Sequence, residues 1–414
     1  MLNKIFLFII YIRQKIFSSH TWILRNLLYT GKVCSHFPHC SEYWKQCFER
    51  YNFLDALKYT MTRIWNCKPS NKIKYDPAFY KVVFFSSSNI WLSFFKKLLD
   101  DKRFDVVWIV TMPDAPFWRW KKLKENIVAE EFKKLNQNNF ENKEKYIDDL
   151  NEIEEIALNG KKIKIFKPKK IKNNDVFYNE LKSLNSDYFV VISYWKILPK
   201  SILNIPKIWP INIHWSILPK YRWASPIQSV FLNKEKETWI TIMYMNEKMD
   251  EWDIIKILKF SLTKNDNSKT VIEKFNKFWP SFVADTLWDF AKWKLKRIKQ
   301  DLNSVTYCGK FEKKDWKISF QNETAESIYS KFQAFYLWPW IYTYWNWKLL
   351  KFTAIDIEEW NLQQWKVVFD NWILKIWTKK WNIIVKKVKL EWKKEMTASE
   401  FINWYKGFLW TILE

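Results

Sequence analysis

Tryptophan stands at turn positions of this chain where a folded protein ordinarily needs glycine. Trp372 in Asp-Asn-Trp, Trp347 in Trp-Asn-Trp and Trp293 in Ala-Lys-Trp-Lys are examples. Glycine is favoured at such positions because it reaches positive φ without the steric penalty of a Cβ atom. The 414 residues include 29 tryptophans and four glycines, whereas average usage at this length is about 29 glycines. The two counts therefore look exchanged.

We interpret the exchange as a translation effect: UGA codons that encode glycine in this gene were translated here as tryptophan. The alternative is a genuinely tryptophan-rich protein with bulky rings at turn after turn, which turn chemistry disfavours. UGG codons at Trp215, Trp223 and Trp252 would contradict the recoding.

Charge and cysteine usage narrow the class of protein. The net charge is +25, and a basic surface attracts polyanions such as nucleic acid or an anionic membrane. A genome rich in A and T, which favours lysine codons, is the alternative source of this charge. Five cysteines, four of them within residues 34–67, do not indicate a disulfide-built secreted domain.

The N-terminal apolar run covers residues 5–12, whereas spanning a bilayer takes about 20 residues. Arg13 and Lys15 follow it at once, which favours a helix lying in the membrane plane, with an ordinary core helix as the alternative. No small-residue cleavage site of a signal peptide follows.

From Lys81 onward, the pattern predicts strands that alternate with helices and hence a parallel α/β sheet. The expected strands are 81–85, 106–110, 163–166, 188–192 and 211–214, with a helix at 92–99. A charged insertion at 136–158 is expected to be helical and exposed.

The C-terminal part predicts a small β-barrel, because short apolar runs recur there with turn signals between them. These runs are 348–352, 366–369, 373–376 and 383–388. At 414 residues, the chain is long enough for two or three domains. We divide it into a module at 1–75, a catalytic domain at 80–285, a linker at 286–304 and a β domain at 305–414.

The densest group of polar residues lies at 211–228 and continues to Asp250. Side chains alternate along a strand, so Asn212 and His214 point to the same face, at the strand's carboxyl end, where open α/β sheets place ligands. Asn212 can donate to a developing oxyanion, His214 can do the same or move a proton, and Asp250 can orient the imidazole. These groups suit acyl transfer to an amine, although a structural polar pair would give the same local pattern.

With tryptophan read as glycine, residues 212–228 become Asn-Ile-His-Gly-Ser-Ile-Leu-Pro-Lys-Tyr-Arg-Gly-Ala-Ser-Pro-Ile-Gln. This segment resembles the signature of the methionyl-tRNA formyltransferase family. Further matches to the family occur in order along residues 80–414, at 111–123, 193–200, 238–243, 249–253, 334–340 and 391–401. Tryptophan falls repeatedly where the family has glycine, whereas Trp22, Trp338 and Trp345 are candidates for genuine tryptophans.

The resemblance implies a Rossmann-like formyltransferase domain followed by an OB-like β-barrel that binds tRNA. It assigns formyl transfer to Asn212, His214 and Asp250, without a metal. It also implies that 10-formyltetrahydrofolate is the co-substrate and methionyl initiator tRNA the acceptor. The folate contacts are Ser216, Ile217, Leu218 and Pro219, and the residues that approach the tRNA acceptor end are Arg119, Lys121 and Lys122. Residues 85–90, Phe-Ser-Ser-Ser-Asn-Ile, depart from the family's Phe-Gly-Thr-Pro-x-Phe, which leaves details of that loop open.

Residues 1–75 resemble a different family, the small membrane protein insertion efficiency factors. The resemblance rests on Cys34-x5-Cys40-Ser-Glu-Tyr, a helical run from Lys45 to Trp65, and Arg-Ile-Trp-Asn-Cys-Lys-Pro at 63–69. It implies a small helical module that binds an anionic membrane surface. The candidate zinc ligands are Cys34, His36, His39, Cys40 and Cys67. Because the x5 spacing is not that of a zinc hairpin, we prefer a reduced or core-packed thiol cluster.

The sequence thus predicts a fusion of a membrane-surface module with a cytoplasmic, monomeric enzyme. One alternative is a formyltransferase that acts on an amino sugar or a nucleotide, against which the Ala-Ser-Pro-Ile-Gln continuation and the C-terminal β-barrel count. The other is a membrane-assembly factor with an inactive enzyme half, against which the intact set of Asn212, His214 and Asp250 counts.

Overall fold

The computed structural model divides the chain into two compact units. Unit 1 comprises residues 1–212, 244–247 and 280–297, and unit 2 comprises residues 213–243, 248–279 and 298–414. The structure describes Asn3, Ile5, Leu7 and Ile10, then 36–66, 74–88, 92–116, 123–135, 145–147, 151–158, 161–336, 339–359, 366–411 and Leu413.

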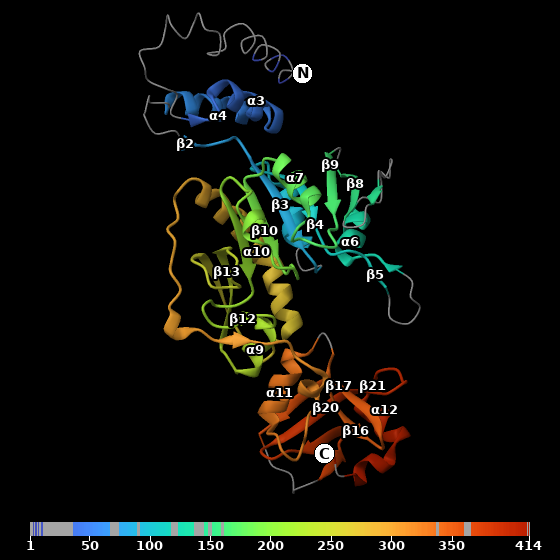
Figure 1. The fold of residues 1–414 in the computed structure, drawn as a ribbon. Helices are drawn as coiled ribbons and strands as arrows, with labels where there is room; N and C mark the ends of the chain where they lie inside the picture. The colour runs from blue at the N-terminus through green and yellow to red at the C-terminus, as the bar shows by residue number, and fades with distance from the viewer. Residues whose placement is uncertain are drawn as a thin grey trace, which may run out of the picture. The chain divides into compact units, whose positions relative to one another are not determined.

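A nine-stranded sheet has the strand order β14-β13-β11-β10-β3-β4-β9-β8-β7 (Figure 1). Its strands are β3 (Tyr80–Ser86), β4 (Phe104–Val110), β7 (Lys145–Ile147), β8 (Glu152–Leu158), β9 (Lys161–Phe166), β10 (Tyr188–Ile192), β11 (Trp209–His214), β13 (Glu237–Tyr244) and β14 (Ile254–Ser261). The pairings that join β11, β10, β3, β4 and β9 are parallel, and those of β8 with β9, β7 with β8 and β13 with β14 are antiparallel. The predicted parallel α/β sheet is therefore confirmed, with antiparallel strands at both edges.

The middle strands form because their apolar residues run without interruption. Every residue of β10 is buried, and in β3 only Lys81 is not, as expected for parallel strands covered on both faces. Phe85, Trp108 and Phe166 belong to one buried cluster over this part of the sheet. The helices of this region are α5 (Leu92–Asp100), α6 (Ile127–Leu135), α7 (Asp175–Ser183), α8 (Lys200–Leu203), α9 (Pro226–Leu232) and α10 (Ser268–Ala291).

The insertion at 136–158 is not helical where the structure describes it, so the prediction of an exposed helical segment is wrong there. Strands β7 and β8 pair with each other, and β8 pairs with β9 from Ile153↔Phe166 to Leu158↔Lys161. Asn151 and Glu154 are buried. Pairing with the free edge of β9, together with a buried partner for Glu154 described below, outweighs the weak preference of glutamate for helices.

The N-terminal module contains α3 (Cys40–Arg50) and α4 (Phe53–Trp65). The single helical run expected from Lys45 to Trp65 is therefore interrupted. Asn52 causes the break, because its side chain accepts a hydrogen bond from the backbone N–H of Asp55 at 2.9 Å and caps α4. Ile10 is buried in a cluster with Cys47 and Phe48, which favours a core role for this residue over a membrane-facing one.

Two short strands of unit 1, β1 (His36–Phe37) and β2 (Lys74–Tyr75), pair in parallel. Within the described part of the chain, no helix combines the length and the apolar character needed to cross a bilayer.

Most of the C-terminal part forms an antiparallel β domain with the strand order β16-β17-β20-β19-β18, and β21 pairs with β20 (Figure 1, orange to red). Its strands are β16 (Ile341–Trp345), β17 (Lys348–Glu358), β18 (Val367–Asp370), β19 (Ile373–Trp377), β20 (Asn382–Leu390) and β21 (Met396–Thr397), and its helices are α11 (Ala325–Ala334) and α12 (Ala398–Trp404). This arrangement agrees with the predicted OB-like domain. The short strands β12 (Arg222–Trp223) and β15 (Tyr307–Cys308) pair with each other before it.

Tryptophan is common where the backbone is left-handed. Among the described residues, fifteen that are not glycine have positive φ, and seven of them are tryptophan. These seven are Trp223, Trp293, Trp340, Trp347, Trp372, Trp381 and Trp392. The two described glycines, Gly309 and Gly407, lie outside the left-handed region.

Candidate active site

Strand β11 carries Asn212 and His214 at its carboxyl end. Its parallel partner β10 places Val191 opposite Asn212, so both strands end at the same edge of the sheet. Asn212 is half-buried, and His214 is only 6% exposed. The alternation along β11 puts the two side chains on one face, as the sequence predicted.

The His214 ring lies between two acceptors of unit 2. Its Nε2 lies 3.0 Å from the carbonyl oxygen of Tyr221, and because a carbonyl only accepts, Nε2 carries a proton. Its Nδ1 lies 3.7 Å from Asp250 Oδ1, which is longer than a direct hydrogen bond. A proton at Nδ1 would therefore face the Asp250 carboxylate.

Asp250 is held in place from two sides. Its Oδ2 accepts a hydrogen bond from the backbone N–H of Trp223 at 2.9 Å, and its backbone, with φ of 57°, is left-handed. The Gln300 side-chain amide donates to the Asp250 carbonyl at 3.0 Å. Gln300 in turn accepts from the buried Arg222 guanidinium at 2.9 Å.

The sequence did not single out Gln300 or Arg222 as positioning residues. Arg222 lies inside the recognised motif, so its place there was an available signal. Gln300 lies in a lysine-rich stretch with no pattern of its own, and only the fold brings it to Asp250.

The segment predicted to contact folate is anchored through its backbone. The Thr241 hydroxyl donates to the Ser216 carbonyl at 2.6 Å, and the Ser216 hydroxyl donates to the Lys220 carbonyl at 2.7 Å. Ser216 and Leu218 are buried, whereas Ile217 and Pro219 are partly exposed. Of the four predicted contacts, the side chains of Ile217 and Pro219 are therefore the more accessible to a ligand.

Two tryptophans of this region of unit 2 pack against other aromatic rings. Trp215 is buried, and its ring stacks on Phe275 with centroids 5.3 Å apart. Trp223 is 48% exposed at φ of 86°, and its ring lies 4.5 Å from that of Tyr307. The backbone of Trp223 holds Asp250, but its indole has no part in that hydrogen bond.

The predicted tRNA contacts Arg119, Lys121 and Lys122 lie outside the described residues. The strands that flank them, β5 (Ala115–Pro116) and β6 (Leu123–Lys124), pair as an antiparallel hairpin.

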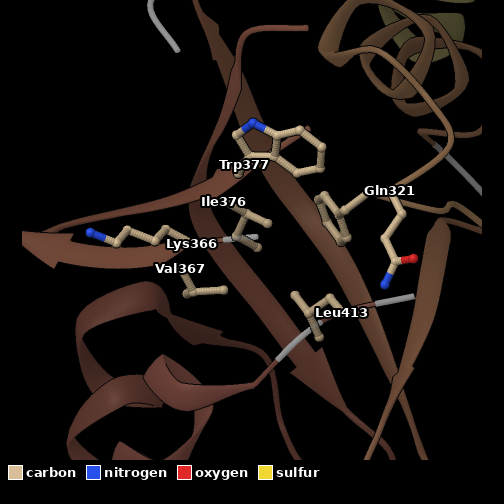
Figure 2. A pocket seen from close by; sticks show the side chains of 7 residues that line it. Gln321, Lys366, Val367, Ile376, Trp377 and Leu413 are labelled. Carbon is tan, nitrogen blue, oxygen red and sulfur yellow. The ribbon is translucent and has the colours of Figure 1, made fainter. Parts of the chain in front are cut away.

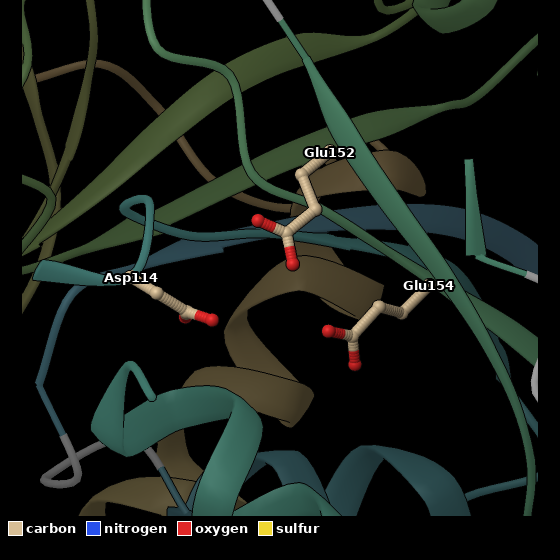
Figure 3. A group of neighbouring side chains, drawn as sticks. All are labelled: Asp114, Glu152 and Glu154. Carbon is tan, nitrogen blue, oxygen red and sulfur yellow. The ribbon is translucent and has the colours of Figure 1, made fainter. Parts of the chain in front are cut away.

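Among the described residues, the predicted zinc ligands do not form a group that could hold a metal ion. Cys34 and Cys67 lie outside the described residues, and Cys40 forms no disulfide bond. Among the described residues, the group of carboxylates that could hold a metal is Asp114, Glu152 and Glu154 (Figure 3). The ammonium group of Lys167 lies among these carboxylates, 2.9–3.3 Å from an oxygen of each. Although burial by itself lowers the pKa of Lys167, the hydrogen bond that its ammonium donates to Asp114 and the charge of Glu154 raise that pKa above its ordinary value.

A small pocket lies within the C-terminal β domain (Figure 2). It is lined by Val367, Ile376 and Leu413, with Gln321 and Lys366 beside them. Its volume of about 10 Å³ is room for about one water molecule, so it does not hold a substrate.

The chain belongs to the formyl transferase family. The family model for formyl transferase matches residues 80–287, that for the formyl transferase C-terminal domain matches residues 310–406, and that for membrane protein insertion efficiency factor matches residues 2–79. Both predicted resemblances are thereby confirmed.

The chain is similar to methionyl-tRNA formyltransferases. It is 31% identical to that of Caldicellulosiruptor saccharolyticus over 78% of this chain and 97% of the relative, and 32% identical to that of Campylobacter lari over 78% and 96%. Among solved structures, HypX from Aquifex aeolicus is similar in fold, with a TM-score of 0.52 at 11% identity over 80% of this chain and 50% of HypX.

Proposed function

We propose that this chain transfers the formyl group of 10-formyltetrahydrofolate to the α-amine of methionyl initiator tRNA. The observation that carries the proposal is the pairing of His214 with Asp250. His214 ends β11 and lies two residues after Asn212. Membership of the formyl transferase family gives the reaction class. The match covers nearly the whole length of relatives named methionyl-tRNA formyltransferase, and that name supports methionyl-tRNA as the acceptor.

The proposed chemistry needs hydrogen-bond donors and a proton acceptor rather than a covalent intermediate on the protein. The α-amine forms a bond to the formyl carbon of the folate co-substrate, and the bond from that carbon to the folate nitrogen breaks. The amine loses one proton, the folate nitrogen gains one, and tetrahydrofolate leaves. Asn212 donates to the carbonyl oxygen on which negative charge develops as the amine attacks. His214 adds to that stabilisation and accepts or returns a proton, and Asp250 orients the imidazole. The accessible surface of Ile217 and Pro219 suits contact with a flat pterin ring.

Asn212→Asp tests the role of the carboxamide, because it keeps the shape but replaces the donor with an acceptor. Losing one oxyanion donor costs about 10²–10³ in kcat, so formylation should fall by that factor with the folded structure unchanged. Asn204→Asp, at an exposed helix end, is the matched control and should retain full activity. Turnover of the Asn212 variant within about threefold of the parent would refute the assignment.

The acceptor distinguishes the proposal from its rivals. Formylation is measured with charged initiator tRNA, charged elongator tRNA, amino sugars and aminated nucleotides as acceptors. The proposal requires a strong preference for charged initiator tRNA. Preference for a small amine would support the sugar or nucleotide alternative, and no transfer to any acceptor would support an inactive enzyme half.

We assign Arg119, Lys121 and Lys122 to the tRNA acceptor end and the lysine-rich β domain to the tRNA backbone. Arg119→Ala should reduce discrimination between initiator and elongator tRNA more than overall affinity. Neutralised phosphates also give binding a steep salt dependence. Equal losses for both tRNAs would reduce Arg119 to a generic phosphate contact.

The N-terminal module is proposed to bind an anionic membrane surface from the cytoplasmic side, on a chain that is otherwise monomeric. Residues 1–76 carry 12 Lys or Arg and 4 Asp or Glu, which suits acidic headgroups. The chain should float with vesicles that contain phosphatidylserine and not with phosphatidylcholine vesicles, and removal of residues 1–75 should abolish flotation. Light scattering checks the monomer.

We also propose that the functional protein carries glycine at most positions written here as tryptophan. The seven left-handed tryptophans support this proposal. Glycine has no Cβ to strain these turns. Mass spectrometry of the protein from its own cells tests it, and tryptophan at positions 223, 347 and 372 would refute it.

A further inference from the structure

A buried lysine joins three segments of unit 1 that are distant in sequence. Lys167 is 0% exposed and follows β9 directly. Its ammonium group lies 2.9 Å from Asp114 Oδ1, 3.3 Å from Glu152 Oε1 and 3.0 Å from Glu154 Oε1. A buried ammonium is very unfavourable unless it is paired, so these contacts hold the lysine and its partners together.

The three carboxylates would repel one another without a cation between them. The carboxylate oxygens lie within 4.8 Å of one another, and Figure 3 shows the three groups converging on a shared space. The Lys167 ammonium occupies that space. The cluster is therefore the socket of a lysine rather than a vacant metal site.

One side of this socket is the base of the β5–β6 hairpin. Asp114 precedes β5, and its Oδ1 also accepts a hydrogen bond from the backbone N–H of Asn126, just after β6, at 2.9 Å. The Thr111 hydroxyl donates to the Asn126 side chain at 2.9 Å. Within the described residues, two residues of each hairpin strand are paired, and the hydrogen bond between Asp114 and Asn126 closes the base of the hairpin.

The other side of the socket is the insertion. Glu152 and Glu154 are two residues apart on β8 and so share one face, and both reach Lys167. The Lys167 backbone N–H also donates to the Glu152 carbonyl at 2.7 Å. The added strand thus supplies two of the three carboxylates that hold the lysine.

We infer that Lys167 is a positioning residue for tRNA recognition, through which the insertion strand β8 braces the base of the β5–β6 hairpin. The inference rests on the proposed function, because the hairpin connects to Arg119, Lys121 and Lys122. It gives the insertion a role: it fixes the orientation of the hairpin relative to strand β9, which Lys167 follows.

Lys167→Gln removes the positive charge that pairs with Asp114, Glu152 and Glu154. Lys170→Gln is the matched control, because it removes the same charge from an exposed position three residues further on. Both variants are made in the full-length chain with glycine at the positions proposed above. Asp114→Asn is a second variant that keeps an acceptor for Asn126 and serves where Lys167→Gln does not fold.

The first measurement is limited trypsin digestion followed by mass spectrometry, which does not depend on activity. Cleavage after Arg119, Lys121 and Lys122 should become about tenfold faster in Lys167→Gln relative to sites elsewhere in the domain, and should not change in Lys170→Gln. Equal acceleration at all sites would mean that Lys167 only stabilises the domain, and unchanged cleavage would mean that it does not hold the hairpin. Either result would overturn the inference.

The second measurement separates the two substrates. In Lys167→Gln the KM for methionyl initiator tRNA should rise about tenfold, while the KM for the folate changes by less than about twofold. Adding Asp114→Asn to Lys167→Gln should cause little further change, because both act through one contact. A parallel rise in both KM values would overturn the inference. If the parent chain formylates no tRNA, the proposed function fails while the digestion still tests the brace.

Discussion

Trp345 and Trp347 are two residues apart at one end of the β16–β17 hairpin, yet their surroundings are opposite. Trp345 is 8% exposed, and its ring meets those of Phe401, Tyr405 and Phe408 edge to face at 5.5–5.7 Å. Trp347 is 98% exposed and has φ of 64°. The fold uses the side chain at position 345, whereas at position 347 it uses only the backbone.

The β18–β19 hairpin repeats the second environment. In both hairpins a two-residue turn, Asn346-Trp347 or Asn371-Trp372, joins the paired strands, and both residues of each turn have positive φ. That combination is a type I′ turn, for which Asn-Gly is the preferred sequence. Tryptophan therefore occupies two kinds of position in this sequence, and the backbone conformation distinguishes them.

The largest expected effect is that of all the exchanged positions together. A residue with a Cβ at a left-handed position costs about 1–3 kcal/mol, and seven such tryptophans sum to a penalty comparable with a typical stability of about 5–15 kcal/mol. We expect the chain translated with tryptophan to be largely insoluble and inactive, and the glycine-restored chain, with Trp345 kept, to fold and formylate. Solubility and formylation of the two chains check this. Equal activity would remove the physical basis of the recoding.

The next effect is expected at Trp345 in the restored chain. Truncating a buried tryptophan to alanine costs about 3–5 kcal/mol, because the three aromatic partners lose their contact. Urea denaturation of Trp345→Ala measures the loss. A change below about 1 kcal/mol would show that the side chain of Trp345 contributes little to stability, as expected for the turn positions. That result would contradict the contrast between Trp345 and Trp347.

A third effect concerns the turn tryptophan nearest the proposed site. A restored chain that retains Trp223 should lose at least about tenfold in kcat/KM, because its half-exposed indole is carried by the backbone that donates to Asp250. A restored chain that retains Trp392, 84% exposed at φ of 63° in the C-terminal β domain, is the control and should keep its activity. Equal losses in both chains would show that strain rather than crowding is measured.

The sequence predicted what depends on local rules. Alternation along a strand and the end of that strand were enough to bring Asn212 and His214 together, and the turn dipeptides were enough to mark Trp347 and Trp372. The central strands were predictable because their apolar runs are continuous.

What it could not predict depends on partners distant along the chain. Gln300 reaches Asp250 from 50 residues away, and Lys167 lies in a basic stretch like many others in this chain. The pattern of the charged insertion predicts an exposed helix, and nothing in the sequence pairs its glutamates with Lys167. Once Lys167 is buried beside β8, Glu154 has a partner.

The smallest effect is also the most direct test of what position 347 needs. In a restored chain that retains only Trp347, replacing it with glycine should raise the free energy of unfolding by about 1 kcal/mol, since relief of left-handed strain exceeds the added freedom of glycine in the unfolded chain. Trp347→Ala should give almost none of this gain, because alanine keeps the Cβ that causes the strain. The 98% exposed indole has little packing to lose in either variant, so urea denaturation of the pair compares backbone terms alone. If alanine stabilises as much as glycine, the indole itself is at fault and the turn does not require glycine; if neither does, the left-handed backbone at Trp347 is not strained.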